Sequence, residues 1–252
     1  AADDQFVAGD VIILDNDVTI VGTTPGPYSR NATQIFFDGR DKVGATAPVA
    51  MSRAAFPPTP GSVMAGGSEM FDTTQWGKSY VAPVGENTSA PNTSAFEDTR
   101  WFIMAGPGGA TINVDANADG DVLDANDLSG VVLTEGSRRA VDGINHGATL
   151  TVTSGNAVQV NSMTADVDDT FEFRWDALVP RPNWSNDYIT PVGTDPQTSL
   201  QGCTEIWAFN PNAAQITINF DRPGGVSYPS ADGSFTVNAN SNAASPTATN
   251  LL

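Results

Sequence analysis

Residues 101–114 read WFIMAGPGGATINV, which is two short apolar runs around a cluster of glycine and proline. Aromatic and β-branched residues favour strands, whereas Gly and Pro favour the turns that end them. A phosphate-binding loop would need a helix after the glycines and a lysine close by, and here a strand pattern follows. The stretch therefore predicts two strands, Trp101–Met104 and Thr111–Val114, joined by a turn.

The same pattern recurs along the whole chain, and helical periodicity is hard to find. The 24 Gly and 17 Pro punctuate the apolar runs. Short strands with such turns predict an all-β protein with little or no helix, made of β-sandwiches rather than alternating strands and helices. The other predicted strands are Asp10–Leu14, Asp17–Val21, Gln34–Phe37, Pro48–Ser52, Thr149–Thr153, Ala157–Val160, Thr170–Trp175, Glu205–Phe209, Gln215–Phe220 and Ser234–Val237.

An internal repeat predicts two related units. The pattern W-x-x-x-Y-x-x-P-V-G begins at Trp76 and returns at Trp184, 108 residues later. Two further pairs of blocks keep the order and nearly the same spacing, and tandem duplication produces such a series. We expect two closely joined β-sandwich-like units, residues 1–135 with an N-terminal extension and residues 136–252 with a polar C-terminal tail. The further pairs are PVAMS at 48–52 with AVQVN at 157–161, and TINVD at 111–115 with TINFD at 217–221.

In each copy of the repeat, the Trp and Tyr are interpreted as core anchors. Pro-Val-Gly is interpreted as a turn that ends a strand, because Pro cannot donate to a ladder and Gly adopts a positive φ. The alternative is an exposed aromatic patch for glycans or a partner chain, which requires the rings to lie at the surface.

The chain resembles the IgGFc-binding-protein-like domain of large bacterial surface proteins and animal mucus-associated proteins. The resemblance implies an extracellular or surface-anchored β-rich module, embedded in adhesive or structural chains and without known chemistry. It carries no residue signature for antibody binding. Its carriers, in order over residues 9–240, are Gly9–Ile12, Pro48–Pro57, Trp76–Gly85, Thr111–Gly120, Arg174–Trp175 with Leu178–Pro180, and Trp184–Gly193.

The charge of the chain narrows the choice of partners. There are 29 acidic and 11 basic side chains, which give a formal net charge of −18. We expect no nucleic-acid partner, and anionic membranes are poor partners too, since a phosphate surface requires the opposite sign. Cations remain the natural partners, and the alternative is that the acidity maintains solubility in a salty setting.

The most specific local motif is DANADGDVLDAND at 115–127. Oxygen-bearing side chains at positions 1, 3 and 5, with Gly at position 6, direct ligands at one Ca²⁺. The motif departs from an EF-hand because position 12 is Asn126 and a strand precedes it. The alternative is a turn in which Asn and Asp cap their own backbone. The predicted calcium ligands are Asp115, Asn117, Asp119, Asp121 and Asp124.

Catalytic chemistry finds little support in the sequence. The chain has one His and one Cys, His146 and Cys203, far apart, which cannot make a zinc site or a nucleophile–base pair by spacing. Among 29 acids some carboxylate pair always lies within hydrolase range, so abundance is uninformative. Asp166–Asp169 and Asp15–Asp17 are interpreted as turns. We therefore expect no enzyme.

The start of the chain and its hydropathy predict an extracellular or cell-surface protein. Ala1-Ala2-Asp3-Asp4 resembles a mature N-terminus after signal cleavage. No apolar run approaches the roughly 18 residues that span a bilayer. One Cys excludes an internal disulfide.

These observations favour a structural subunit of an extracellular filament, tube, sheath or surface layer. We expect it to be stabilised by calcium and to form a homo-polymer, in which Gln5–Leu14 pairs with an exposed sheet edge of a neighbour. The alternative is a monomeric adhesin or a module that binds glycans or surface proteins through exposed Trp side chains. A hydrolase is the third alternative and would require a cleft with perturbed carboxylates.

Overall fold

The fold is all-β, as predicted. The computed structural model describes residues 45–55, 66–88, 96–167, 173–189, 206–220 and 233–244. In these residues every strand ladder is antiparallel, no α-helix occurs, and 3-10 geometry is found at Phe96 and in η2 (Arg181–Asn183). The strands are β1 (Ser52–Ala55), β2 (Gly66–Glu69), β3 (Ser79–Val81), β4 (Asp98–Ala105), β5 (Ala110–Asp115), β6 (Leu128–Leu133), β7 (Arg138–Val141), β8 (Thr149–Gly155), β9 (Val158–Ala165), β10 (Phe173–Ala177), β11 (Trp207–Asn210), β12 (Ile216–Phe220), β13 (Gly233–Val237) and β14 (Ser241–Ala244).

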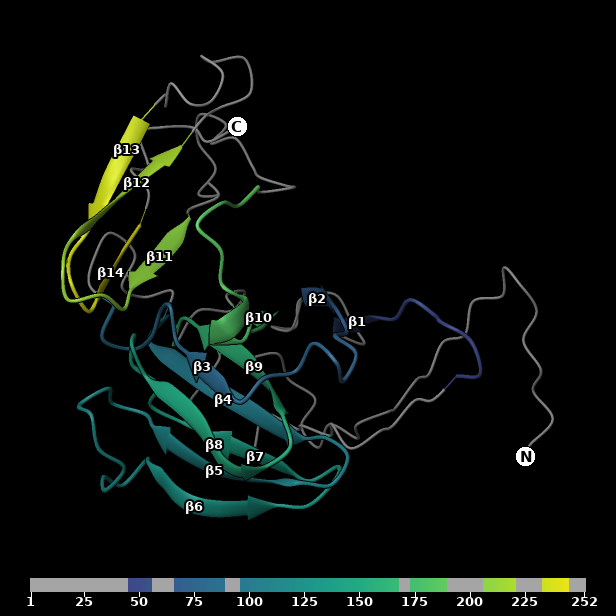
Figure 1. Cartoon of the computed structure of the whole chain (residues 1–252). Helices are drawn as coiled ribbons and strands as arrows, with labels where there is room; N and C mark the ends of the chain where they lie inside the picture. The colour runs from purple at the N-terminus through teal and green to yellow at the C-terminus, as the bar shows by residue number, and fades with distance from the viewer. Residues whose placement is uncertain are drawn as a thin grey trace.

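Two four-stranded sheets form the larger part of the fold (Figure 1). One sheet has the order β10-β9-β4-β7 and the other has the order β3-β8-β5-β6. β4 and β5 are the two strands of the WFIMAGPGGATINV stretch, and they lie in different sheets. Gly108 and Gly109 between them have φ values of 79° and 70°, which other residues rarely adopt, so the chain turns sharply from one sheet into the other here.

One hydrophobic core fills the space between these sheets. β4 and β9 supply Trp101, Ile103 and Val160, and β5 and β8 supply Ile112 and Leu150, all fully buried. Burying each such side chain contributes about 1.5–3 kcal/mol. The shared core makes the eight strands a single β-sandwich.

The predicted unit boundary at 135–136 falls between β6 and β7, within this sandwich. Strands before the boundary pair with strands after it, because β3 and β5 pair with β8 and β4 pairs with both β7 and β9. In the described part of the chain, both sheets of the sandwich therefore contain strands from either side of this boundary. The strands β6 and β7 were missed in the sequence because Gly130 interrupts the first and Arg138-Arg139 open the second.

A second pair of sheets repeats the pairing order of the first. Residues 111–115 lie in β5 and their repeat counterparts 217–220 lie in β12, so β4 corresponds to β11. β4 pairs with β9 and β5 with β8, and likewise β11 pairs with β14 and β12 with β13. Asn113 lies opposite Thr151 as its counterpart Asn219 lies opposite Ser234. Each set is one long antiparallel ladder divided at a turn.

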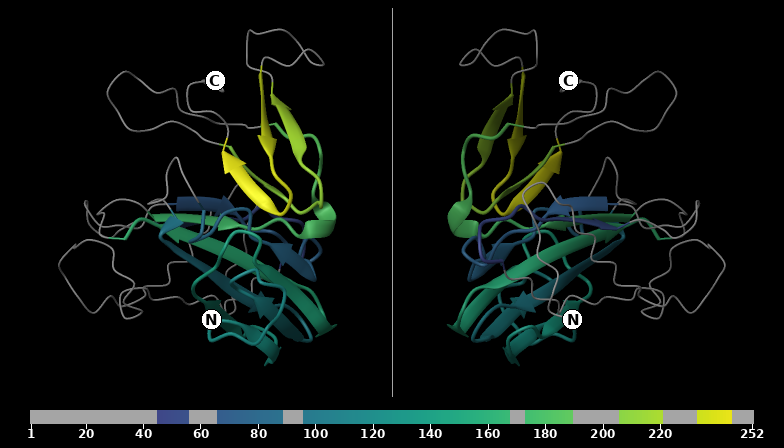
Figure 2. Two further views of the ribbon diagram at one scale, coloured as in Figure 1. Left: turned by 90° about the vertical axis from the view of Figure 1, so that its left-hand side faces the viewer. Right: turned by 90° about the vertical axis from the view of Figure 1, so that its right-hand side faces the viewer.

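The second pair of sheets lies on one side of the sandwich (Figures 1 and 2). Aromatic and amide side chains connect the two parts. The contacts are a T-shaped pair of Trp207 with Phe96 (ring centroids 5.0 Å apart), Phe209 against His146 (6.3 Å), and hydrogen bonds from Asn242 Nδ2 to Pro83 O (3.1 Å) and Thr88 Oγ1 (3.0 Å).

The two copies of the W-x-x-x-Y pattern share their local hydrogen bonds. In each copy the indole N–H donates to the carbonyl five residues earlier, and the tyrosine hydroxyl accepts from the backbone N–H after the Trp. This shared geometry supports the repeat seen in the sequence. The hydrogen bonds are Trp76 Nε1 to Phe71 O (2.9 Å), Trp184 Nε1 to Val179 O (3.2 Å), Gly77 N to Tyr80 Oη (2.9 Å) and Ser185 N to Tyr188 Oη (2.8 Å).

The glycine of the first Pro-Val-Gly is required for a different reason from the one predicted. Gly85 does not adopt a positive φ. A Cβ there would lie 2.2 Å from the carbonyl carbon of Asn145, so close packing of two backbones excludes any side chain. The predicted strands in residues 10–37, the segment Gln5–Leu14, Asp15–Asp17 and Cys203 lie outside the described residues.

Candidate metal centre

The acidic loop connects β5 to β6, so a strand flanks it on each side; the strand before the loop was predicted from the sequence, and β6 after it was not. Asp115 is the last residue of β5, and Asn117, Asp119, Asp121 and Asp124 follow in the loop. Gly120 has a φ of 98° and allows the sharp turn in the middle of the loop, which is the role predicted for it.

Side-chain oxygens cap the backbone along the loop. Asn117 Oδ1 accepts from Asp119 N at 3.1 Å, Asp119 Oδ1 accepts from Asp121 N at 3.1 Å, and Asp121 Oδ1 accepts from Leu123 N at 2.9 Å. These successive Asx turns are the alternative considered for this sequence. They hold the side chains in fixed directions, so the capping turn and a metal cluster are compatible here.

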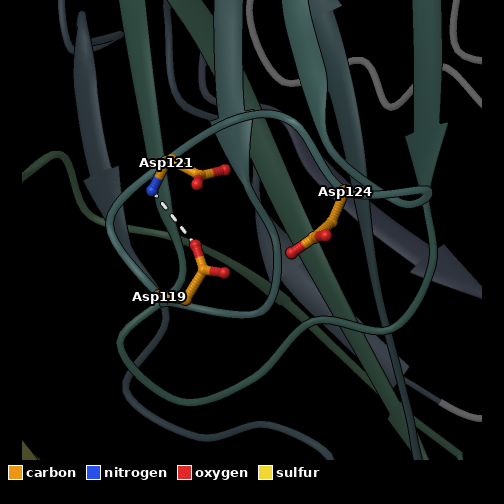
Figure 3. Close-up of side chains that lie close together, drawn as sticks. All are labelled: Asp119, Asp121 and Asp124. Carbon is orange, nitrogen blue, oxygen red and sulfur yellow. Dashed lines mark hydrogen bonds between the residues drawn. The ribbon is translucent and has the colours of Figure 1, made fainter.

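Three of the five predicted ligands come together at the surface. Asp119, Asp121 and Asp124 are exposed, and each offers a carboxylate oxygen such that all three oxygens lie within 4.8 Å of one another. Figure 3 shows the three side chains directed toward a common space enclosed by the loop. This exposed cluster could hold a metal ion.

Asn117 lies between two of these carboxylates. Its Nδ2 donates to Asp119 Oδ2 at 3.1 Å and to Asp124 Oδ2 at 2.5 Å. The hydrogen bonds from the Asp121 amide and from Asn117 lower the pKa of Asp119. At Asp124 the Asn117 hydrogen bond favours the ionised form, but the proximity of Asp119 outweighs it and raises the pKa of Asp124. The two carboxylates therefore repel each other, which a cation would relieve.

Asp115 lies behind the cluster and is only 7% exposed. Its Oδ2 accepts from Gly120 N at 2.9 Å, and its Oδ1 is buried without a hydrogen-bond donor in the described part of the chain. Burial raises the pKa of Asp115 more than the loop amides lower it. No Asp115 oxygen is among the three that converge. Asp115 instead stabilises the turn of the loop by accepting the Gly120 hydrogen bond.

Two residues that the sequence analysis did not single out hold the loop closed. Asp127 accepts from Ala116 N at 2.8 Å and from Asp124 N at 3.0 Å, one bond through each carboxylate oxygen. Asn145 donates to Asn117 O at 3.0 Å and its backbone N–H donates to Ala116 O at 2.8 Å. Asp127 follows the capping pattern of its neighbours, whereas Asn145 is distant in sequence and gives no local signal.

The donor set determines which ion the cluster could take. Carboxylate oxygens are hard ligands that suit Ca²⁺, Mg²⁺ or Mn²⁺. Ca²⁺ takes 6–8 oxygens with flexible geometry, so the loop would supply three carboxylates and water the remainder. A bidentate Glu at the end of the loop is lacking in the sequence, which favours a weaker site than an EF-hand.

The remaining candidate groups are not part of the carboxylate cluster. His146 is half-buried near Phe209, and burial lowers its pKa. All five Trp are described, and each is buried or half-buried. No helix with the length and apolarity of a membrane span occurs in the described residues.

Comparison with known proteins gives no relative. No family model matches the chain, and neither the curated proteins nor the solved structures contain a match. The resemblance to the IgGFc-binding-protein-like domain therefore stays a prediction.

Proposed function

We propose that the chain is a calcium-stabilised structural subunit of an extracellular homo-polymer. The observation that carries this proposal is the unequal burial of the two related pairs of sheets. The inward apolar side chains of β5 and β8 are buried, whereas the same face of β12 and β13 is half-buried except at Val237, which is fully buried. The half-buried counterparts are Ile216, Ile218, Phe220 and Phe235.

Apolar side chains left half-buried favour association, because further burial contributes about 25 cal/mol per Å². In this proposal the second pair of sheets is a sandwich that a second copy of the chain completes. Calcium at Asp119, Asp121 and Asp124 would neutralise part of the net charge of −18 that opposes the approach of like chains.

The alternative function, an adhesin or glycan-binding module with exposed Trp side chains, lacks a supporting observation. None of the five Trp is exposed. Two of them, Trp101 and Trp175, are buried, and Trp175 stacks on Phe102 with ring centroids 4.6 Å apart.

Light scattering of the purified full chain tests the proposed function. We expect a mass far above that of the monomer in Ca²⁺, and a return toward the monomer after chelation. The variant Asp121→Asn should reduce the response to Ca²⁺, and Asp166→Asn, which removes the same charge outside the loop, should leave it unchanged. A monomer at all Ca²⁺ concentrations would overturn the proposal.

A further inference from the structure

The second copy of the W-x-x-x-Y pattern lacks the sheet contact that the first copy makes. Tyr80 and Val81 are 1% and 5% exposed because they lie in β3, which pairs with β8. Their counterparts Tyr188 and Ile189 are 70% and 92% exposed. In Figure 1 the green trace that follows β10 leaves the sandwich at this point.

The first copy shows what this segment is built to contact. Tyr80 donates its hydroxyl to Val158 O at 2.6 Å, and its ring is part of the sandwich core. β3 is the edge strand of its sheet, and the Tyr80 hydroxyl connects it to β9 of the other sheet. The same hydroxyl geometry at Tyr188, set by Ser185 N, has no such carbonyl partner in the described residues.

The strand that would receive this segment is also present. β8 carries β3 on one edge and β5 on the other, whereas its counterpart β13 is paired only with β12 in the described part of the chain. The register of β3 with β8 places Ser79 opposite Thr151. The counterparts of these two residues are Asp187 and Ser234, and both are exposed.

We propose that Tyr188 and Ile189 of one chain add as a strand to the edge of β13 opposite β12 in a second copy, where Tyr188 fills the half-buried face formed by Ile218, Phe220 and Phe235. The segment is exposed in the single chain, so a second copy is the occupant that we assign to this edge. Each chain offers the segment at one place and the edge at another, and such a heterologous contact repeats without closing. This inference rests on the proposed homo-polymer and names its contact.

Cross-linking of two single-cysteine variants tests the register. In a Cys203→Ala background, Asp187→Cys and Ser234→Cys are prepared separately, mixed in Ca²⁺ and oxidised. We expect a disulfide-linked dimer of the two variants, because facing positions in neighbouring strands are close enough for a disulfide. The control replaces Ser234→Cys by Asn219→Cys. Asn219 lies in β12, on the far side of β13 from the proposed contact, so this pair should give much less dimer.

A second measurement separates failure of the contact from failure of the polymer. Ile189→Asp should raise the concentration needed for polymer by about tenfold or more, with an unchanged unfolding temperature of the monomer. Val132→Asp, at a side chain that is 71% exposed on β6, should leave polymerisation unchanged. Polymers without the cross-link, or a link that forms within one chain in a double-cysteine variant, would overturn this inference while the proposed function stands. A chain that never polymerises would overturn both.

Discussion

Two tyrosines in the same repeated pattern have opposite environments in this protein. Tyr80 is buried, accepts from Gly77 N and donates to Val158 O, whereas Tyr188 accepts from Ser185 N and is exposed. Burial raises the pKa of Tyr80 to about 12. The hydroxyl of Tyr80 therefore matters for the stability of the folded chain, while that of Tyr188 contributes only to its own turn.

The two hydroxyl groups can be removed one at a time. Tyr80→Phe should lower the free energy of unfolding by about 1–3 kcal/mol, since it removes two buried hydrogen bonds and leaves Gly77 N only its bond to Val158 O at 3.3 Å. Tyr188→Phe, the matched control, should change it by less than about 0.5 kcal/mol. Urea unfolding at low protein concentration measures both. Equal losses in the two variants would contradict the assigned role of Tyr80.

The loop between β5 and β6 behaves as one element, because Asp127 and Asn145 fix both of its sides while its carboxylates converge. Its charge is its main chemical property. Hydrogen bonds from the Asp121 amide and Asn117 lower the pKa of Asp119, while the proximity of Asp119 raises the pKa of Asp124 against the hydrogen bond from Asn117. Cation binding requires both groups in the ionised form, so protons and Ca²⁺ compete for this element.

Calcium affinity should therefore fall as the pH is lowered from 7 into the carboxylate range, with Asp124 taking up the first proton. Isothermal titration in buffers of different ionisation enthalpy would show protons released on binding at the lower pH. Asp124→Asn should weaken binding and flatten this pH dependence. An affinity that is constant down to pH 4 would show that the cluster does not bind the ion.

At the scale of the whole molecule, the contact between the sandwich and the second pair of sheets contains the only His of the chain. His146 lies against Phe209, and its backbone N–H donates to Asn87 Oδ1 at 2.7 Å. Burial lowers the pKa of His146, so the folded protein favours the neutral imidazole. The unfolded chain binds a proton at the ordinary pKa, and stability is lost as the pH falls through that value.

This linkage predicts a mild acid sensitivity that depends on one residue. Between pH 7.5 and 5.5 the unfolding temperature of the native chain should fall by roughly 2 °C more than that of His146→Gln. Differential scanning calorimetry of the two proteins at matched pH provides the comparison. Parallel pH profiles would mean that His146 is equally solvated in the folded and unfolded states.

The strands were predictable where apolar residues follow one another, as in β4, or alternate with polar residues, as in β5, β8 and β12. β3 escaped detection because its three residues lie inside the repeated pattern, where Tyr80 was correctly assigned to the core without a strand around it. The division of each ladder into two sheets depends on which strands pair across long loops, and local sequence carries no such information.

The candidate site was predictable in part for a similar reason. Spacing brought Asp119, Asp121 and Asp124 together because they share one short loop. Asp115 has the right residue type, but as the last residue of β5 it is turned toward the buried side. Burial is a property of packing, so residue type alone could not separate Asp115 from the three exposed carboxylates.

The turn at Trp184–Tyr188 already has the hydrogen bonds that its counterpart at Trp76–Tyr80 has inside the sandwich. A segment that is ordered before it docks loses little conformational entropy on association. Its association rate would then depend on diffusion and orientation rather than on a slow rearrangement. The contact between chains should consequently form fast. Its lifetime would depend on how tightly the Tyr188 ring is packed in the second chain.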